Sequence, residues 1–147
     1  MKRLLKLAVL ALAACSVGAV LAAMLTYTQV PSYVKIVAPP TLEVYNTDWS
    51  PCTQIDWGSV QKGTVKEYGV FLKNGKGDKP MYLIPNKSLV AYNLPPNTLV
   101  GWTLSDIVYL LPGDAIFTTL QLTVQEAAPE GEFTFTIEFR AFDSPYG

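Results

Sequence analysis

Apolar and polar side chains alternate regularly near the end of the chain. The apolar positions of this run are Phe133, Phe135, Ile137, Phe139 and Ala141, and polar residues stand between them. A period of two predicts a β-strand with one face in a core. Residues 119–125 alternate in the same way, and a turn-forming sequence at residues 128–131 separates the two runs. The pattern therefore predicts that the two strands form a hairpin.

Shorter apolar runs upstream predict further strands at residues 42–45, 55–60, 68–74 and 81–84. Sequences rich in Gly, Pro, Asn and Asp, at residues 74–78 and 111–114, predict turns between strands. Helical periodicity is not evident after residue 41. About seven strands in residues 41–147 predict an all-β domain, folded as an antiparallel β-sandwich of two sheets. Trp57 and Trp102 are expected to fill the space between the sheets.

The beginning of the chain has a different pattern. Lys2, Arg3 and Lys6 precede an uncharged apolar run over residues 7–25. This arrangement is typical of a secretory signal or a signal anchor, and it predicts an extracellular or cell-surface protein. Three outcomes stay open: cleavage near residues 22–26, a retained membrane anchor, or lipidation of Cys15, which ends a lipobox-like sequence. Only through residues 1–25, if they are not cleaved, would the chain contact a membrane.

Removal of residues 1–25 changes the charge balance. The whole chain has 11 basic and 12 acidic residues, and three of the basic residues lie in the first segment. The exported part therefore carries 8 minus 12, or −4. Such a balance gives no reason to expect a nucleic-acid or anionic-membrane partner. Cys52 is the only cysteine left, so a disulfide within the domain is excluded. Two alternatives stay open for its thiol: burial, which is the usual case, and pairing with another molecule.

Candidate catalytic chemistry is sparse. The chain contains no histidine, which excludes the usual zinc and copper sites and the Ser-His-Asp triad. Asp56, Asp78, Asp106 and Asp114 stand near strand ends or turns, where an aspartate commonly accepts hydrogen bonds from nearby backbone amides. We therefore expect no enzyme activity, no cofactor and no metal. Asn86 begins an Asn-Lys-Ser sequon and is a candidate glycosylation site.

Several short motifs carry a family resemblance. They are Ile-Asp-Trp-Gly-Ser-Val at 55–60, Lys-Gly-Thr-Val-Lys-Glu-Tyr at 62–68, Val-Phe-Leu-Lys-Asn at 70–74, the turn at 111–114, the strand at 120–124 and the closing Phe-Thr-Phe-Thr-Ile run. Over residues 41–142 the chain resembles the TasA and camelysin family of biofilm fibre subunits and related archaeal surface filament proteins, such as bundling pili and threads. The resemblance implies an immunoglobulin-like sandwich. A protease activity attributed to camelysin is not carried over, because the chain lacks histidine.

The resemblance also implies assembly by donor-strand complementation, in which an N-terminal segment of one subunit fills a groove in the next. Residues 26–40 supply a candidate donor, which ends at Pro39 and Pro40. Its apolar side chains include those of Tyr27, Val30, Tyr33, Val34 and Ile36. Addition of this kind is head-to-tail and produces a homopolymer.

Two other interpretations of residues 26–40 remain open. The segment is either a stalk that holds the domain away from a membrane, or the first strand of its own sandwich. The sequence favours a structural subunit of an extracellular filament, with a role in a biofilm matrix or in cell adhesion. The alternative is a membrane-tethered or lipid-anchored surface module that binds a protein or a carbohydrate.

Overall fold

The computed structural model describes residues 33–39, 41–75 and 77–147, and these form an all-β structure. The candidate residues Cys15, Tyr27 and Val30 lie outside the described residues. The strands in chain order are β1 (Tyr33–Val37), β2 (Leu42–Tyr45), β3 (Gln54–Ile55), β4 (Thr64–Asn74), β5 (Met81–Leu83), β6 (Leu89–Tyr92), β7 (Thr98–Trp102), β8 (Val108–Leu110), β9 (Ala115–Val124) and β10 (Thr134–Phe139). No helix that could cross a membrane is found in this part of the chain.

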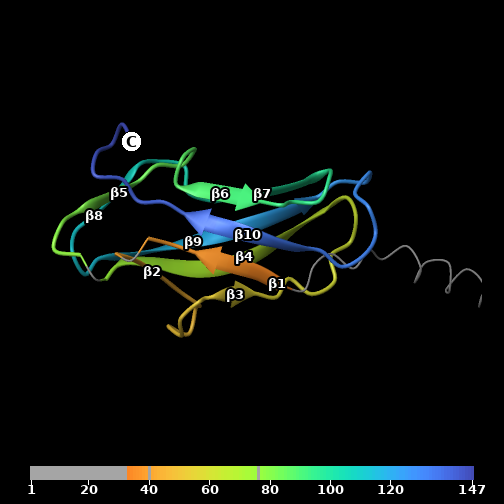
Figure 1. The fold of residues 1–147 in the computed structure, drawn as a ribbon, viewed down its shortest axis with the longest axis horizontal. Coiled ribbons are helices and arrows are strands. Elements are labelled where there is room, and N and C mark those ends of the chain that lie inside the picture. Colours follow the sequence, from red (N-terminus) through yellow and green to blue (C-terminus); the bar gives the residue numbers. More distant parts are fainter. Residues whose placement is uncertain (1–32, 40, 76) are drawn as a thin grey trace, which may run out of the picture.

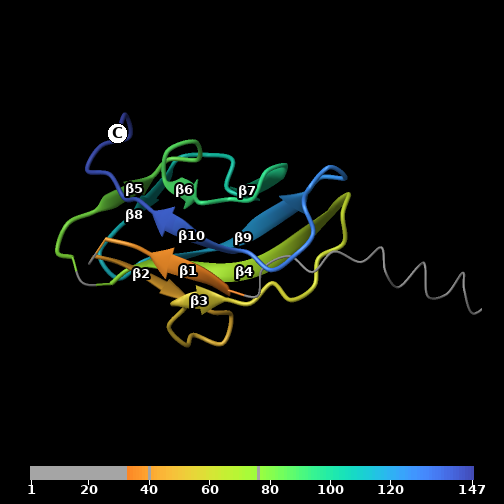
Figure 2. The same cartoon turned by 45° about the vertical axis from the view of Figure 1, so that its right-hand side comes forward.

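The strands form two four-stranded sheets and one two-stranded sheet. One large sheet has the order β3-β1-β10-β6, the other has the order β2-β4-β9-β7, and β5 pairs with β8. Figures 1 and 2 show the two large sheets as separate layers, with β5 and β8 at the end of the molecule that holds the C-terminus. Most neighbouring strands are antiparallel, whereas β1 runs parallel to β10. This arrangement is compatible with a β-sandwich.

A single hydrophobic core contains residues from both large sheets. Leu120, Leu122 and Val124 of β9 are buried, as are Phe135, Ile137 and Phe139 of β10. These are the apolar positions of the two alternating runs, so the faces predicted to be buried are confirmed. Trp57 also belongs to the core, with only 1% of its surface exposed, and Trp102 is half-buried against it.

The predicted hairpin between the two alternating runs is wrong. β9 and β10 belong to different sheets, β9 between β4 and β7 and β10 between β1 and β6. Residues 125–133 carry the chain from one layer to the other. Alternation fixes which face of each strand is buried, but it does not fix which strand is paired beside it. Here the two strands pair with other partners, and their buried faces both contribute to the core between the two sheets.

The strand predicted at residues 55–60 is much shorter in the structure. β3 ends at Ile55, and the next residue, Asp56, accepts a hydrogen bond from the amide of Gly58 through its carboxylate at 2.7 Å. Gly58 has a φ of 60°, a left-handed conformation that suits glycine and turns the chain out of the sheet. Trp57 and Val60 still reach the core, but from a loop.

The sequence pattern does not predict β6, β7 or β8. Leu89, Val90 and Ala91 of β6 are all half-buried, so this strand lacks a clear alternation of buried and exposed positions. β7 contains Gly101, a residue that is uncommon within strands. β6 pairs with β10, β7 with β9 and β8 with β5, so the positions of these strands depend on pairing with other segments and not on their own pattern.

Candidate assembly site

β1, the described part of the candidate donor segment, is a strand within a sheet of its own chain. It pairs with β10 over five positions, from Tyr33 opposite Thr134 to Val37 opposite Glu138. On its other side it pairs with β3, where Val34 lies opposite Ile55. The sheet therefore includes residues on the N-terminal side of Thr41. Within one molecule, this placement corresponds to the third interpretation above, in which the segment is a strand of its own sandwich.

Ile36 connects β1 both to its neighbouring strands and to the core. Its amide donates a hydrogen bond to the carbonyl oxygen of Thr53 at 3.0 Å, and its backbone lies opposite Ile137 of β10. Its half-buried side chain packs against the hydrophobic core. β1 thus satisfies backbone groups on both sides and covers apolar surface, which are the two contributions expected of an added strand.

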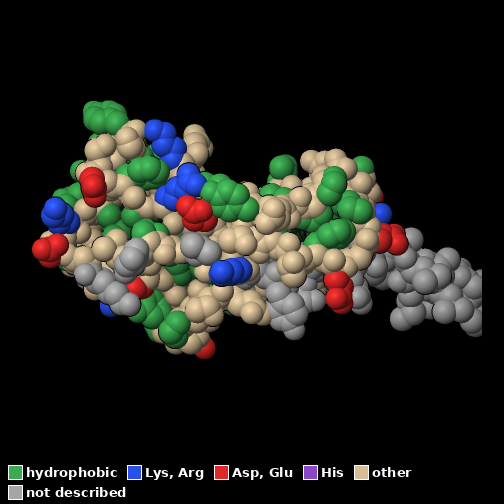
Figure 3. Space-filling view, in the orientation of Figure 1, with side chains coloured by type: hydrophobic (Ala, Val, Ile, Leu, Met, Phe, Trp, Pro, Cys, Tyr) green, Lys and Arg blue, Asp and Glu red, His purple; other side chains and the backbone are tan. Residues whose placement is uncertain are grey.

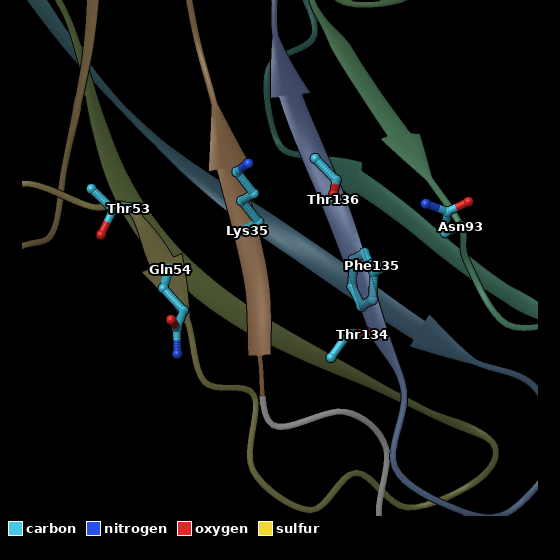
Figure 4. A pocket seen from close by; sticks show the side chains of 7 residues that line it. All are labelled: Lys35, Thr53, Gln54, Asn93, Thr134, Phe135 and Thr136. Atoms are coloured by element: carbon cyan, nitrogen blue, oxygen red, sulfur yellow. The ribbon is translucent and has the colours of Figure 1, made fainter.

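The outer surface of this sheet is polar. A shallow pocket of about 390 Å³ lies over β1, β10 and β3, and it is lined by Lys35, Thr53, Gln54, Asn93, Thr134, Phe135 and Thr136. Figure 4 shows Lys35 and Thr136 on adjacent strands at the same level. Hydroxyl and amide groups with one ammonium group do not form a catalytic constellation. Over the described part of the face in Figure 3, basic and acidic side chains are intermixed, and neither sign forms a continuous patch.

The connection from β1 to β2 is short and crosses between the two large sheets. It consists of residues 38–41, and its sequence includes Pro39 and Pro40. The amide of Leu42 donates a hydrogen bond to the carbonyl oxygen of Pro39 at 3.0 Å, which closes a turn before β2. Proline restricts the backbone, so this connection has few conformations available.

An exposed ion pair lies at the end of β10, next to the edge strand β6, and joins Glu138 of β10 to Arg140, which follows the strand. The Arg140 Nε donates a hydrogen bond to Glu138 Oε1 at 2.7 Å, and Arg140 Nη2 donates one to the Tyr92 hydroxyl at 2.5 Å. The hydrogen bond from Arg140 lowers the pKa of Glu138 below its ordinary value. These three residues link β10 to β6 on the side opposite to β1.

The glycosylation candidate occupies an exposed turn. The Asn86 side chain is exposed between β5 and β6, whereas Ser88 is fully buried and its hydroxyl oxygen accepts a hydrogen bond from the Ile84 amide at 2.7 Å. Ser88 therefore has a structural role of its own in closing this turn.

Cys52 is buried, which is the first of the two alternatives: only 4% of its surface is exposed. Burial raises the pKa of its thiol to about 11.

Asp56 and Asp114 accept hydrogen bonds from backbone amides, as predicted, with Asp114 accepting from the Leu111 amide at 3.2 Å. Asp78 and Asp106 lie in the loops before β5 and β8. In residues 33–39, 41–75 and 77–147, no three acidic, cysteine or histidine side chains form a metal-binding group.

Sequence analysis missed a cluster of aromatic residues on the outer face of the β2-β4-β9-β7 sheet. It consists of Tyr45, Trp49, Phe71 and Phe117, and we call it the aromatic platform. The residues are far apart in the sequence, and only the register of β2, β4 and β9 places them side by side. An outward-facing aromatic residue in each strand was the only signal available.

Comparison of the chain with protein-family models, with curated proteins and with solved structures finds no match.

Proposed function

We propose that the chain is an exported structural subunit of an extracellular filament, and that its subunits are joined by exchange of β1. The fold that suits this role is an immunoglobulin-like sandwich in which β1 is the strand supplied to a neighbour. The position of β1 between β10 and β3 carries the proposal. The apolar, signal-like run at residues 7–25 supports export.

A strand in this position can come from its own chain or from a neighbouring copy. Its five positions opposite β10 and its contact with β3 would be the same in both cases. Without β1, the edge of β10 would expose unpaired backbone groups, and the core would lose the side chain of Ile36. The site therefore needs an occupant, and identical subunits provide one.

The short connection after β1 favours exchange between copies. Residues 38–41 must carry the chain from one sheet to the other within a few residues, and two of those residues are prolines. Short, stiff connections promote strand swapping, because an extended hinge relieves the constraint of folding back. If each copy gives β1 to the next, the contact does not close on itself, and a filament results.

Disulfide trapping distinguishes the two origins of β1. Lys35 lies opposite Thr136 in the β1–β10 register, and both line the outer pocket. In a Cys52→Ala background, one chain carries Lys35→Cys and a second, differently tagged chain carries Thr136→Cys. The two are refolded together and oxidised. If β1 is exchanged, a disulfide should form between the two chains. For the same reason, a chain that carries both substitutions should form disulfide-linked oligomers of increasing size.

The matched control pairs Lys35→Cys with Thr119→Cys, because Thr119 lies on β9 in the other sheet. That pair should form few disulfides between chains. The proposal is wrong if the Lys35→Cys and Thr136→Cys chains form no disulfide with each other and the double variant forms its disulfide within one monomer. In that case β1 is a fixed strand of its own domain.

Electron microscopy of material shed from cells, with N-terminal sequencing of the same sample, tests the proposal on native protein. Filaments whose subunits begin near Thr26 are expected. Intact Met1 or a lipidated Cys15 on membrane-bound, non-filamentous protein would contradict the proposal and favour a tethered surface module.

A further inference from the structure

We propose that the aromatic platform is a binding site for a neutral polysaccharide. This site is independent of β1, because it lies on the outer face of the other large sheet. The inference thus adds a ligand to a subunit that we propose is structural.

The platform has a defined arrangement. Tyr45, Phe71 and Phe117 occupy one row across β2, β4 and β9, since Tyr45 lies opposite Phe71 and Phe71 lies opposite Phe117. Trp49 stacks on Phe71 with ring centroids 4.2 Å apart and an angle of 13° between the rings. Trp49 and Phe117 remain 50% and 51% exposed. The cluster therefore presents aromatic surface to solvent.

The turn that carries Trp49 is held rigidly. Asn46 and Ser50 bond through their backbones, and the Asp48 carboxylate accepts hydrogen bonds from the amide and the hydroxyl of Ser50 at 2.9 and 2.5 Å. The Tyr68 hydroxyl donates a hydrogen bond to the side-chain oxygen of Asn46 at 2.8 Å. The hydrogen bond from the Ser50 hydroxyl lowers the pKa of Asp48, so its carboxylate stays ionised near neutral pH. A rigid support reduces the entropy lost on binding.

Trp49 itself adopts a left-handed backbone conformation, with a φ of 64°. This conformation is unfavourable for a large side chain, and glycine or asparagine would occupy it at lower cost. Because the Trp49 side chain is half exposed, packing in the core does not explain why a tryptophan occupies this position. Strained residues are frequently found at ligand sites.

Phe117 has a partly structural role. Its ring covers Gly69, where an added Cβ would come within 2.9 Å of the ring atoms. Glycines within strands are commonly covered by an aromatic neighbour in this way. The same contact keeps the Phe117 ring in place beside Phe71, so the platform exists before a ligand arrives.

The polar surroundings favour a sugar as the ligand. The next outward positions along β4 and β9 are small, Gly69 and Thr119, and beyond them the Gln121 amide donates a hydrogen bond to Glu67 at 2.9 Å. Aromatic surface beside a shallow polar strip matches a pyranose ring, whose C–H groups pack on the negative ring face and whose hydroxyls need hydrogen-bond partners.

Charge and area narrow the choice of ligand. The charged residues near the platform are three acidic ones, Glu43, Asp48 and Glu67, and one basic one, Lys73. This excess of negative charge disfavours acidic polysaccharides as ligands. The exposed halves of Trp49 and Phe117 amount to roughly 200 Å². A stable protein interface buries about 800 Å² on each partner, so a second copy is a poor match for the platform alone.

Isothermal titration calorimetry of the secreted protein with hydroxyethyl cellulose and laminarin tests the proposal. Binding to at least one of these neutral β-glucans is expected. Trp49→Ala should weaken binding about tenfold or more, and Trp49→Phe should retain part of it. Tyr109→Ala is the matched control, because Tyr109 is an equally exposed aromatic residue on β8, outside the platform. It should bind like the unchanged protein.

Thermal unfolding of each variant verifies that the fold is intact. Absence of binding to both glucans, binding only to polygalacturonate, or equal binding by Trp49→Ala would overturn the proposal. The proposal would also be overturned if Trp49→Ala changed the oligomeric state measured by sedimentation and left glucan binding unchanged. The platform would then be a contact between copies of the chain. Failure of β1 exchange would leave the calorimetric result unchanged, so the two proposals fail separately.

Discussion

Asn74 is a fully buried polar residue at the end of β4. Its side-chain amide nitrogen donates hydrogen bonds to the carbonyl oxygens of Lys79 and Leu110, at 2.8 and 3.1 Å. Its backbone bonds to Gly113 and Asp114. One side chain therefore joins the end of β4 to the loop before β5 and the end of β8. Its amide oxygen is buried without a hydrogen-bond partner among the described residues, so the nitrogen alone makes these connections.

Replacement of this amide should be costly. Asn74→Ala removes both side-chain hydrogen bonds and leaves two carbonyl oxygens without their partner, so we expect a loss of about 2–3 kcal/mol in the free energy of unfolding. Urea denaturation measures the loss. Asn86→Ala is the control, since the Asn86 side chain is exposed, and it should change stability by less than about 0.5 kcal/mol. Equal effects of the two substitutions would contradict the role assigned to Asn74.

Cys52 should be unreactive in the folded protein. Burial raises the pKa of its thiol to about 11, and the thiolate is the reactive form. Alkylation by iodoacetamide between pH 7 and 9, followed by mass spectrometry, should proceed only in denaturant. An exposed thiol in Lys35→Cys, made in a Cys52→Ala background, should react readily. Fast labelling of native Cys52 would show that its burial is transient.

The same thiol makes the free energy of unfolding depend on pH in the alkaline range. The unfolded thiol loses its proton near its ordinary pKa of about 8.5, whereas the folded thiol keeps its proton until about pH 11. The unfolded state therefore binds fewer protons in this range, and the free energy of unfolding falls as the pH rises. Below pH 8 the contribution is fully present. Cys52→Ala should flatten this slope in urea denaturation at pH 8–10, and an unchanged slope would assign it to other groups.

At the scale of elements, β1 is a strand whose main pairing partner is remote in the sequence. It is separated from β10 by most of the domain, and its neighbour β3 has two residues. The residues that follow it pass directly into the other sheet. β1 is therefore held by tertiary contacts, and these are also the contacts that a neighbouring copy could supply.

Proline in β1 should disrupt this strand. Ile36→Pro removes the amide that bonds to Thr53 and places a ring within the sheet, so a loss of about 3 kcal/mol or more is expected. Ile36→Val keeps the amide and should cost about 1 kcal/mol. Thermal and urea unfolding of both variants give the comparison. If the two variants are equally stable, β1 contributes little to the folded domain.

At the scale of the whole molecule, one continuous core joins all three sheets. It includes Leu72 of β4, Leu83 of β5, Leu110 of β8 and Ile137 of β10. The small β5-β8 sheet is further connected to the C-terminal residues, because Tyr82 and Phe142 exchange two backbone hydrogen bonds at 2.8 and 3.0 Å. A core shared in this way makes the described part of the chain one folding unit.

We expect a single cooperative unfolding transition for residues 33–147. Fluorescence of the three tryptophans, which include buried Trp57, reports on tertiary structure, and circular dichroism reports on the sheets, so both signals should change at the same temperature. Calorimetry should give an enthalpy of about 80 kcal/mol that agrees with the van't Hoff value. Two separate transitions would show that the small sheet or β1 unfolds independently.

The sequence by itself determined the class of this fold and the inward faces of its longest strands. Phe135, Ile137 and Phe139 alternate with polar residues, and a strand has a period of two wherever it is placed. Burial of Trp57 followed from its apolar character. The hydrogen bonds of Asp56 and Asp114 to backbone amides were also predictable, because they are formed between residues that are close in the sequence.

Only the tertiary structure decided which strands are neighbours. Alternation in β9 and β10 is equally compatible with a hairpin and with strands in opposite layers, so the sequence could not distinguish them. The same reason applies to β1, whose partners are remote, and to the aromatic platform, whose rings come from three strands and a turn. Local pattern determines the face of a strand that is buried, whereas pairing between distant segments determines what lies beside it.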